Sequence, residues 1–114
     1  MVHIIYYSRP LIILMKTIDL RNDTKDLDLS ERFKAMIEAS PRYNTDFKWT
    51  DKDHEADCCF VLSDRDPEES PDNEHYLLRK DICEDPRRII WNMIKHFPPL
   101  YCLDYGTLYL EKIS

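Results

Sequence analysis

Two stretches of the chain carry apolar residues at the spacing of an amphipathic helix. The first stripe consists of Leu29, Phe33, Met36 and Ile37. Asp28 is expected to cap this helix, with Glu31 completing a capping box, and Ser40-Pro41 is expected to end it. The second stripe runs between the start signal Asp85-Pro86 and the stop signal Pro98-Pro99. It consists of Ile89, Ile90, Met93, Ile94 and Phe97.

Other stretches show the patterns of strands, which are short apolar runs or strict alternation. The continuous run 58–62 predicts a buried central strand, and Phe47 and Trp49 alternate with polar residues as in a half-buried strand. The segment 51–57 is expected to join these two strands as a hairpin. The proline-containing segment 63–73 is expected to form a loop. Further strands are expected over 11–20, 75–82, 100–103 and 107–113.

The first fourteen residues allow two interpretations. Val2 to Tyr7 has the composition of an edge strand, whereas Met15-Lys16 also suits a translation start, which would make residues 1–14 a non-native leader. The apolar stretch 11–15 is much shorter than the ~20 residues that span a bilayer. No signal-peptide cleavage pattern follows it. Either way, residues 1–114 are expected to form a single domain.

The order of these elements predicts the fold class. From residue 11 it reads strand, helix, three strands, helix, and then one or two strands. Two helices packed on one face of a mostly antiparallel sheet would bury both apolar stripes. This order resembles the ferredoxin-like arrangement with additions, in element order only. We therefore expect an α+β fold, for which 114 residues provide a sufficient core.

Composition narrows the possible cofactors and the compartment. Gly106 is the only glycine, which excludes glycine-dependent phosphate loops and dinucleotide-binding loops. The adjacent Cys58 and Cys59 would point to opposite faces of a strand and would not share one zinc ion. We expect no metal and no cofactor. Four cysteines without a secretory signal indicate free thiols in a cytoplasmic protein.

Negative charge is concentrated in one segment, Asp51 to Glu74. It holds ten acidic and two basic side chains, a local charge of −8, while the whole chain carries −6 and the remainder therefore +2. This sign disfavours direct binding to nucleic acid or to a membrane surface and favours a basic protein partner. The alternative to a binding surface is that this segment forms two solvated loops whose charge only keeps the protein soluble.

The sequence predicts a non-catalytic acidic protein that inhibits or regulates a basic macromolecular partner, such as a nuclease or another nucleic-acid-binding protein. Trp91 would be an interface anchor beside arginines, although burial under the C-terminal segment is the alternative. The expected carboxylate carriers are Asp64, Asp66, Glu68, Glu69, Asp72 and Glu74. In bulk properties only, such a chain is similar to immunity proteins, phage anti-defence proteins and DNA mimics.

Two other function classes remain open at this stage. One is a structural or self-associating domain that forms a homo-oligomer through an uncovered edge strand. The other is a small enzyme whose site is assembled from residues distant in sequence. Four histidines and two cysteines outside the central run are available for it, but nothing in the sequence pairs them. They are His3, His54, His75, His96, Cys83 and Cys102.

Overall fold

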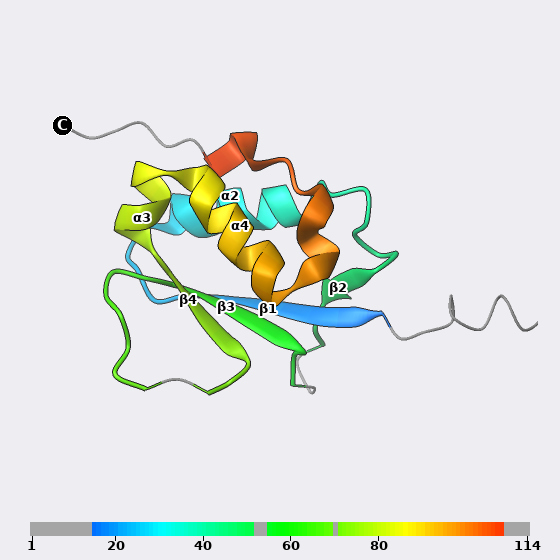
Figure 1. Ribbon diagram of the computed structural model, residues 1–114, viewed down its shortest axis with the longest axis horizontal. Helices are drawn as coiled ribbons and strands as arrows, with labels where there is room; N and C mark the ends of the chain where they lie inside the picture. Colours follow the sequence, from blue (N-terminus) through cyan, green and yellow to red (C-terminus); the bar gives the residue numbers. More distant parts are fainter. Residues whose placement is uncertain (1–14, 52–54, 70, 109–114) are drawn as a thin grey trace, which may run out of the picture.

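The computed structural model describes residues 15–51, 55–69 and 71–108 (Figure 1). Its strands are β1 (Lys16–Asn22), β2 (Phe47–Trp49), β3 (Cys58–Ser63) and β4 (Glu74–Leu78). Its α-helices are α2 (Leu27–Glu38), α3 (Arg79–Glu84) and α4 (Pro86–His96). Two 3-10 turns, η2 (Pro98–Cys102) and η3 (Tyr105–Leu108), follow α4. The expected strand at Val2 to Tyr7 lies outside the described residues.

The four strands form one sheet in the order β2-β1-β3-β4, and every neighbouring pair is parallel. Lys16 pairs with Phe47, Ile18 with Cys58, and Cys59 with Glu74. The prediction of a mostly antiparallel sheet was therefore wrong, and so was the hairpin over 51–57. β2 and β3 follow one another in sequence, but β1 lies between them.

The physical reason for this error is the fully buried strand β3. All six residues of β3 are buried, as is typical of the central strand of a parallel sheet, whose sequence is a continuous apolar run and does not alternate. Apolar periodicity identifies such a strand but carries no information about its direction or its neighbours. The alternation at Phe47 and Trp49 predicted β2 correctly as a strand, and for the same reason did not reveal its partner.

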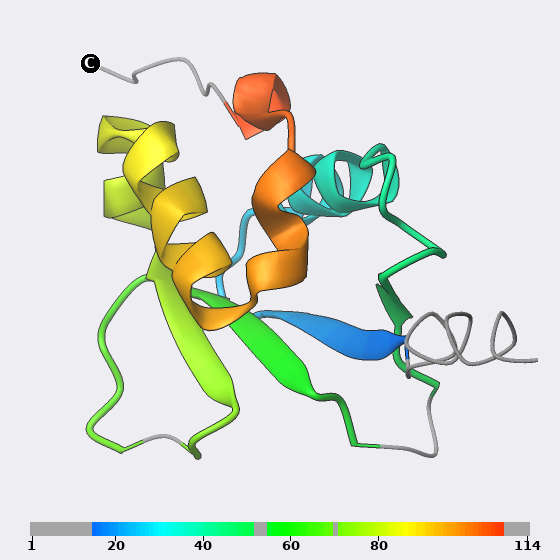
Figure 2. The same ribbon diagram turned by 45° about the vertical axis from the view of Figure 1, so that its right-hand side comes forward.

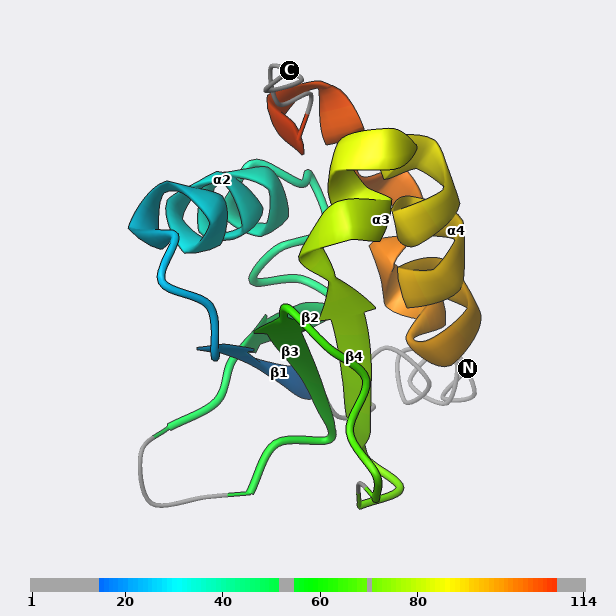
Figure 3. The same cartoon turned by 90° about the vertical axis from the view of Figure 1, so that its left-hand side faces the viewer.

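One face of the sheet packs against the helices that the structure describes. The strand residues in the hydrophobic core alternate along each strand and so point to one side: Ile18, Phe47, Cys58, Phe60, Leu62 and Leu77. The apolar stripes of α2 and α4 meet them there, together with Leu100, Leu103 and Leu108 from the C-terminal turns. Figures 1 and 3 show the helices on this side of the sheet.

The ends of the helices follow local chemistry. Asp26 caps α2, since its Oδ1 accepts a hydrogen bond from the backbone N–H of Leu29 at 3.1 Å. The prediction of Asp28 as the cap was wrong by two residues, and Asp28 lies in the first turn. Asp85 caps α4 by accepting from the N–H of Arg87, and Pro86 begins the helix, as predicted.

The C-terminal part and the end of β4 differ from the expected strands. β4 ends at Leu78, and residues 79–84 form α3 in place of a strand that continues to residue 82. The expected strand at 100–103 is replaced by η2, since Pro98-Pro99 at its start fix backbone angles that suit a 3-10 turn. The expected strand at 107–113 falls on η3 and then on residues outside the described ones.

The described residues of the loop after β3, 64–69 and 71–73, lie on the side of the sheet away from the helices, as Figures 1 and 2 show. The connection from β1 to β2 and the connection from β3 to β4 run in opposite directions across the sheet. Because such crossovers are almost always right-handed, two that run in opposite directions pass over opposite faces. Among the described residues, no helix covers this second face, which we call the open face.

Candidate functional site

A cavity of about 470 Å³ lies where β1 and β3 end. It is bounded by the residues that follow the two strands and by one residue of β4: Asp23, Ser63, Asp64, Arg65, Asp66, Pro67 and Tyr76. These two strands are adjacent, and their outgoing connections leave in opposite directions. The crevice outside the carboxyl ends of such a strand pair is where open parallel sheets bind their ligands.

Three of the seven residues that line this cavity are aspartates. Asp23 comes from the end of β1, whereas Asp64 and Asp66 come from the loop after β3, about forty positions further along the chain. Arg65 is the cation in the lining, and Ser63 and Tyr76 supply hydroxyl groups. Within the part of the chain that the structure describes, no ion pair is formed by Asp64 or Asp66. Their negative charge therefore faces solvent.

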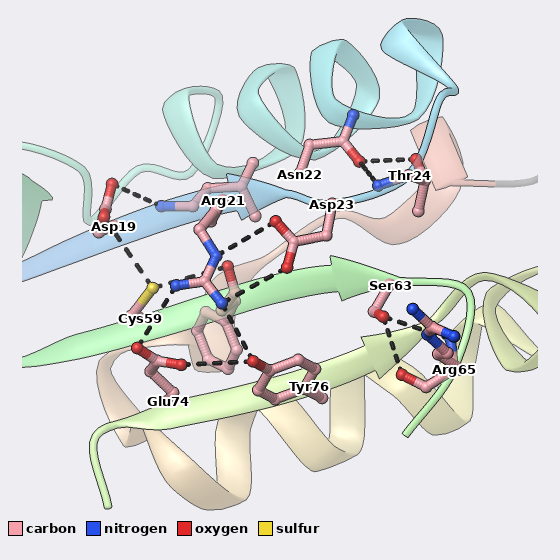
Figure 4. A network of polar contacts seen from close by, with 12 residues as sticks. Asp19, Arg21, Asn22, Asp23, Thr24, Cys59, Ser63, Arg65, Glu74 and Tyr76 are labelled. Carbon is pink, nitrogen blue, oxygen red and sulfur yellow. Dashed lines mark hydrogen bonds and ion pairs between the residues drawn. The ribbon is translucent and has the colours of Figure 1, made fainter. Parts of the chain in front are cut away.

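A polar network covers the open face beside the cavity (Figure 4). The Arg21 guanidinium donates to Asp23 Oδ1 at 3.2 Å, to Glu74 Oε2 at 3.4 Å and to the hydroxyl of Tyr76 at 3.0 Å. Burial alone would lower the pKa of Arg21, but the hydrogen bond and charge of Asp23, with the charge of Glu74, outweigh it and raise the pKa. Arg21 therefore stays charged and bridges β1 to β4 above Val61, which is fully buried.

The loop 64–72 carries most of the acidic residues that the sequence singled out. Asp64, Asp66, Glu68, Glu69 and Asp72 are all exposed. Glu74 is different, because it begins β4 and pairs with Arg21 with only 19% of its side chain exposed. The loop returns to the start of β3, where Cys59 N–H donates to the backbone oxygen of Asn73 at 2.8 Å.

The acidic loop that precedes β3 and the acidic loop that follows it approach each other at the amino ends of the strands. Asn73 Nδ2 donates to the backbone oxygen of Ala56 at 3.4 Å, which places Asp57 and Asp72 at the same end of the sheet. Asp57 also accepts a hydrogen bond from the N–H of Thr17 at 2.8 Å. Asp64 and Asp66 lie at the opposite end of the strands, in the cavity. The carboxylates therefore spread along one side of the molecule.

Trp91 lies apart from these carboxylates. It is 72% exposed, so its burial under the C-terminal segment, the alternative that the sequence left open, does not occur in the described residues. It sits on α4, on the helix side of the sheet, whereas the acidic loop lies on the other side (Figure 1). Arg87, Arg88 and Lys95, at helical spacing from it, are also exposed. The structure thus does not bring Trp91 together with the acidic residues.

The buried thiols have the electrostatics of inert side chains. Burial, followed by the charges of Cys59 and Asp57, raises the pKa of Cys58 to about 12. Burial, followed by the charges of Asp19 and Glu74, raises the pKa of Cys59 to about 11. A nucleophilic cysteine needs a pKa lowered by a neighbouring cation or base. All four cysteines are free, and neither of these two meets that requirement.

Two histidines meet across the helix side of β4. The rings of His75 and His96 stack with their centroids 3.9 Å apart and an interplanar angle of 15°. Burial, and then the charge of His96, lower the pKa of His75. Among the described residues, no group of three or more histidine, cysteine or carboxylate side chains is placed to hold a metal ion. Likewise, no described helix is both long and apolar enough to cross a membrane.

Sequence reasoning missed Asp23, Arg21 and Tyr76. The sequence did not single out Asp23, because its role depends on β1 and β3 ending side by side, and that depends on the strand direction. Arg21 and Tyr76 occupy alternate positions of their strands, which marks them as lying on one face, but not as neighbours. In the comparisons with protein-family models, curated proteins and solved structures, none matches this chain.

Proposed function

We propose that this chain is a non-catalytic binding module that inhibits or regulates a basic macromolecular partner, through the cavity at the strand ends and the loop 64–72. The observation that carries the proposal is the convergence of Asp23, Asp64 and Asp66 on one cavity, from two segments far apart in sequence. Carboxylates gathered in a recess focus a negative field that speeds encounter with a basic surface.

The loop extends this field beyond the cavity. Glu68, Glu69 and Asp72 are exposed on the same side of the molecule, and no ion pair with a described residue offsets them. The raised thiol pKa values of Cys58 and Cys59 argue against these two residues as nucleophiles. The free cysteines fit a reducing compartment, so we place the protein and its partner in the cytoplasm.

Affinity capture with charge-reversed variants tests this proposal. The double variant Asp64→Lys/Asp66→Lys should lose a basic partner that the unaltered protein retains at low salt and releases as salt rises. The matched control is Glu31→Lys/Glu84→Lys, which makes the same charge change on exposed positions of α2 and α3. We expect the control to retain the partner. Equal retention by both variants, or capture that is insensitive to salt, would contradict the proposal.

A further inference from the structure

We propose that the open face of the sheet docks a basic amphipathic helix of the partner, which displaces Arg21 from its carboxylates. This inference rests on the proposed function, because it specifies the shape and charge of the partner. It goes beyond the cavity and the loop, since it assigns a role to the face formed by β1, β3 and β4.

The first step is the architecture. Parallel sheets occur almost always with both faces covered, usually by helices. Here every described helix lies on one side, and the alternate residues of β1, β3 and β4 point toward the open face. On β3 these residues are small: Cys59, Val61 and Ser63. The flanking strands carry longer side chains at the paired positions, and the three β3 residues between them are buried. We call this row of β3, between its two neighbouring rows, the trough.

The second step is size. Neighbouring strands lie about 4.8 Å apart, so the rows on β1 and β4 are separated by about 10 Å. This matches the diameter of an α-helix with its side chains, about 10–12 Å. A helix laid along β3 would therefore place side chains over both rows. The six residues of β3 give it a length of about 20 Å, or nearly four helical turns.

The third step is charge. In the sheet register, Asp19 on β1 and Glu74 on β4 flank Cys59, so that two carboxylates face each other across the trough. Asp23 extends the β1 row at its carboxyl end and lines the cavity. Among the described residues, Asp19, Asp23 and Glu74 thus border the trough, while Arg21 crosses it and Arg65 lies beside Asp23 in the cavity lining. Charge complementarity therefore selects a helix that carries lysine or arginine on either side of a narrow apolar stripe.

Arg21 now occupies the position that a cation of the partner would take. It crosses the trough above Val61 to reach Glu74 and Tyr76, while its side chain stays 45% exposed. The Arg21–Asp23 pair is exposed on both sides, and such pairs contribute little to stability, so a cation of the partner can displace Arg21. Removal of Arg21 should consequently strengthen binding of a basic helix, because it leaves Asp23 and Glu74 unpaired.

The test uses the full chain, labelled with ¹⁵N, and a synthetic amphipathic helical peptide of leucine and lysine as the probe. We expect its addition to shift the amide resonances of residues 17–21, 59–63 and 74–76. Arg21→Met should bind the peptide several-fold more tightly, and Asp19→Lys about fivefold more weakly. Glu84→Lys, on the helix side, should bind as the unaltered chain does. Circular dichroism verifies that each variant is folded.

The outcomes separate this inference from the proposed function. Shifts confined to residues 64–72 would overturn docking on the open face and leave the acidic binding module standing. No binding at low salt would overturn both. Docking would also be overturned if Arg21→Met weakened binding, or if a leucine-glutamate peptide bound equally well. The inference would also be overturned if, without peptide, the open face were found in contact with a second copy of the chain or with residues 1–14. Either contact would mean that the face has a different occupant.

Discussion

At the scale of single residues, the open face depends on Arg21. A parallel sheet without a second helical layer exposes backbone and apolar side chains to water. Here Val61 is nevertheless fully buried, because Arg21 and Tyr76 meet above it at 3.0 Å. The aliphatic stem of an arginine covers apolar surface while its head stays in water. The Arg21 side chain therefore supplies part of the cover that a helix would normally provide.

Replacement of Arg21 should have a modest and measurable effect on stability. Arg21→Ala is expected to lower the free energy of unfolding by about 1 kcal/mol, since it removes exposed ion pairs and uncovers Val61. Arg21→Met keeps most of the stem and should cost less. Urea denaturation of the three proteins provides the measurement. If both variants were equally destabilised, the ion pairs and not the cover would be the larger contribution.

His75 makes stability depend on pH near neutrality. Its pKa is lowered in the folded chain, so the unfolded chain, with an ordinary pKa near 6.5, binds more protons as the pH falls. Stability from this group is therefore fully present above about pH 6.5 and is lost as the pH falls through that value toward the folded pKa. His75→Phe, which retains a ring against His96, should show a flatter dependence between about pH 7.5 and 5.5 in urea denaturation. An unchanged slope would contradict this assignment.

At the scale of elements, the sequence predicted those parts that depend on local chemistry. The start of α4 at Asp85-Pro86, the stripe of α2 and the buried run of β3 all follow from neighbours within a few positions. The direction and order of the strands do not, because they depend on partners 15 to 40 positions away. The cavity was missed for the same reason, although Asp64 and Asp66 were singled out by their charge.

The caps of α2 provide a test at this scale. Asp26→Ala should cost about 1 kcal/mol of stability, since it removes the cap of Leu29 N–H and the ion pair with Arg79. Asp28→Ala should cost less, because Asp28 makes an exposed pair with Arg32 within the helix. Thermal unfolding monitored by circular dichroism compares the two. A larger effect at Asp28 would show that the helix begins later than Leu27.

At the scale of the whole molecule, charge is divided between two sides. The acidic loop and the carboxylates of the open face lie on one side, while α4 presents exposed Arg87, Arg88 and Lys95 around Trp91 on the other. The sequence suggested a single anionic contact with Trp91 as its anchor. The structure separates the two, so that a contact through the loop would leave Trp91 in solvent.

The parallel arrangement also bears on how the chain reaches its native state. The sheet that the structure describes contains no hairpin: Lys16 pairs with Phe47, Ile18 with Cys58, and Cys59 with Glu74. Each pairing must close a long loop of backbone, at a cost in entropy, before the hydrogen bonds and side-chain contacts between the strands form. This slows folding relative to helical domains of similar length. β3 and β4 are nearest in sequence and should associate first. During synthesis β1 therefore stays unpaired until its partners β2 and β3, from the middle of the chain, have left the ribosome.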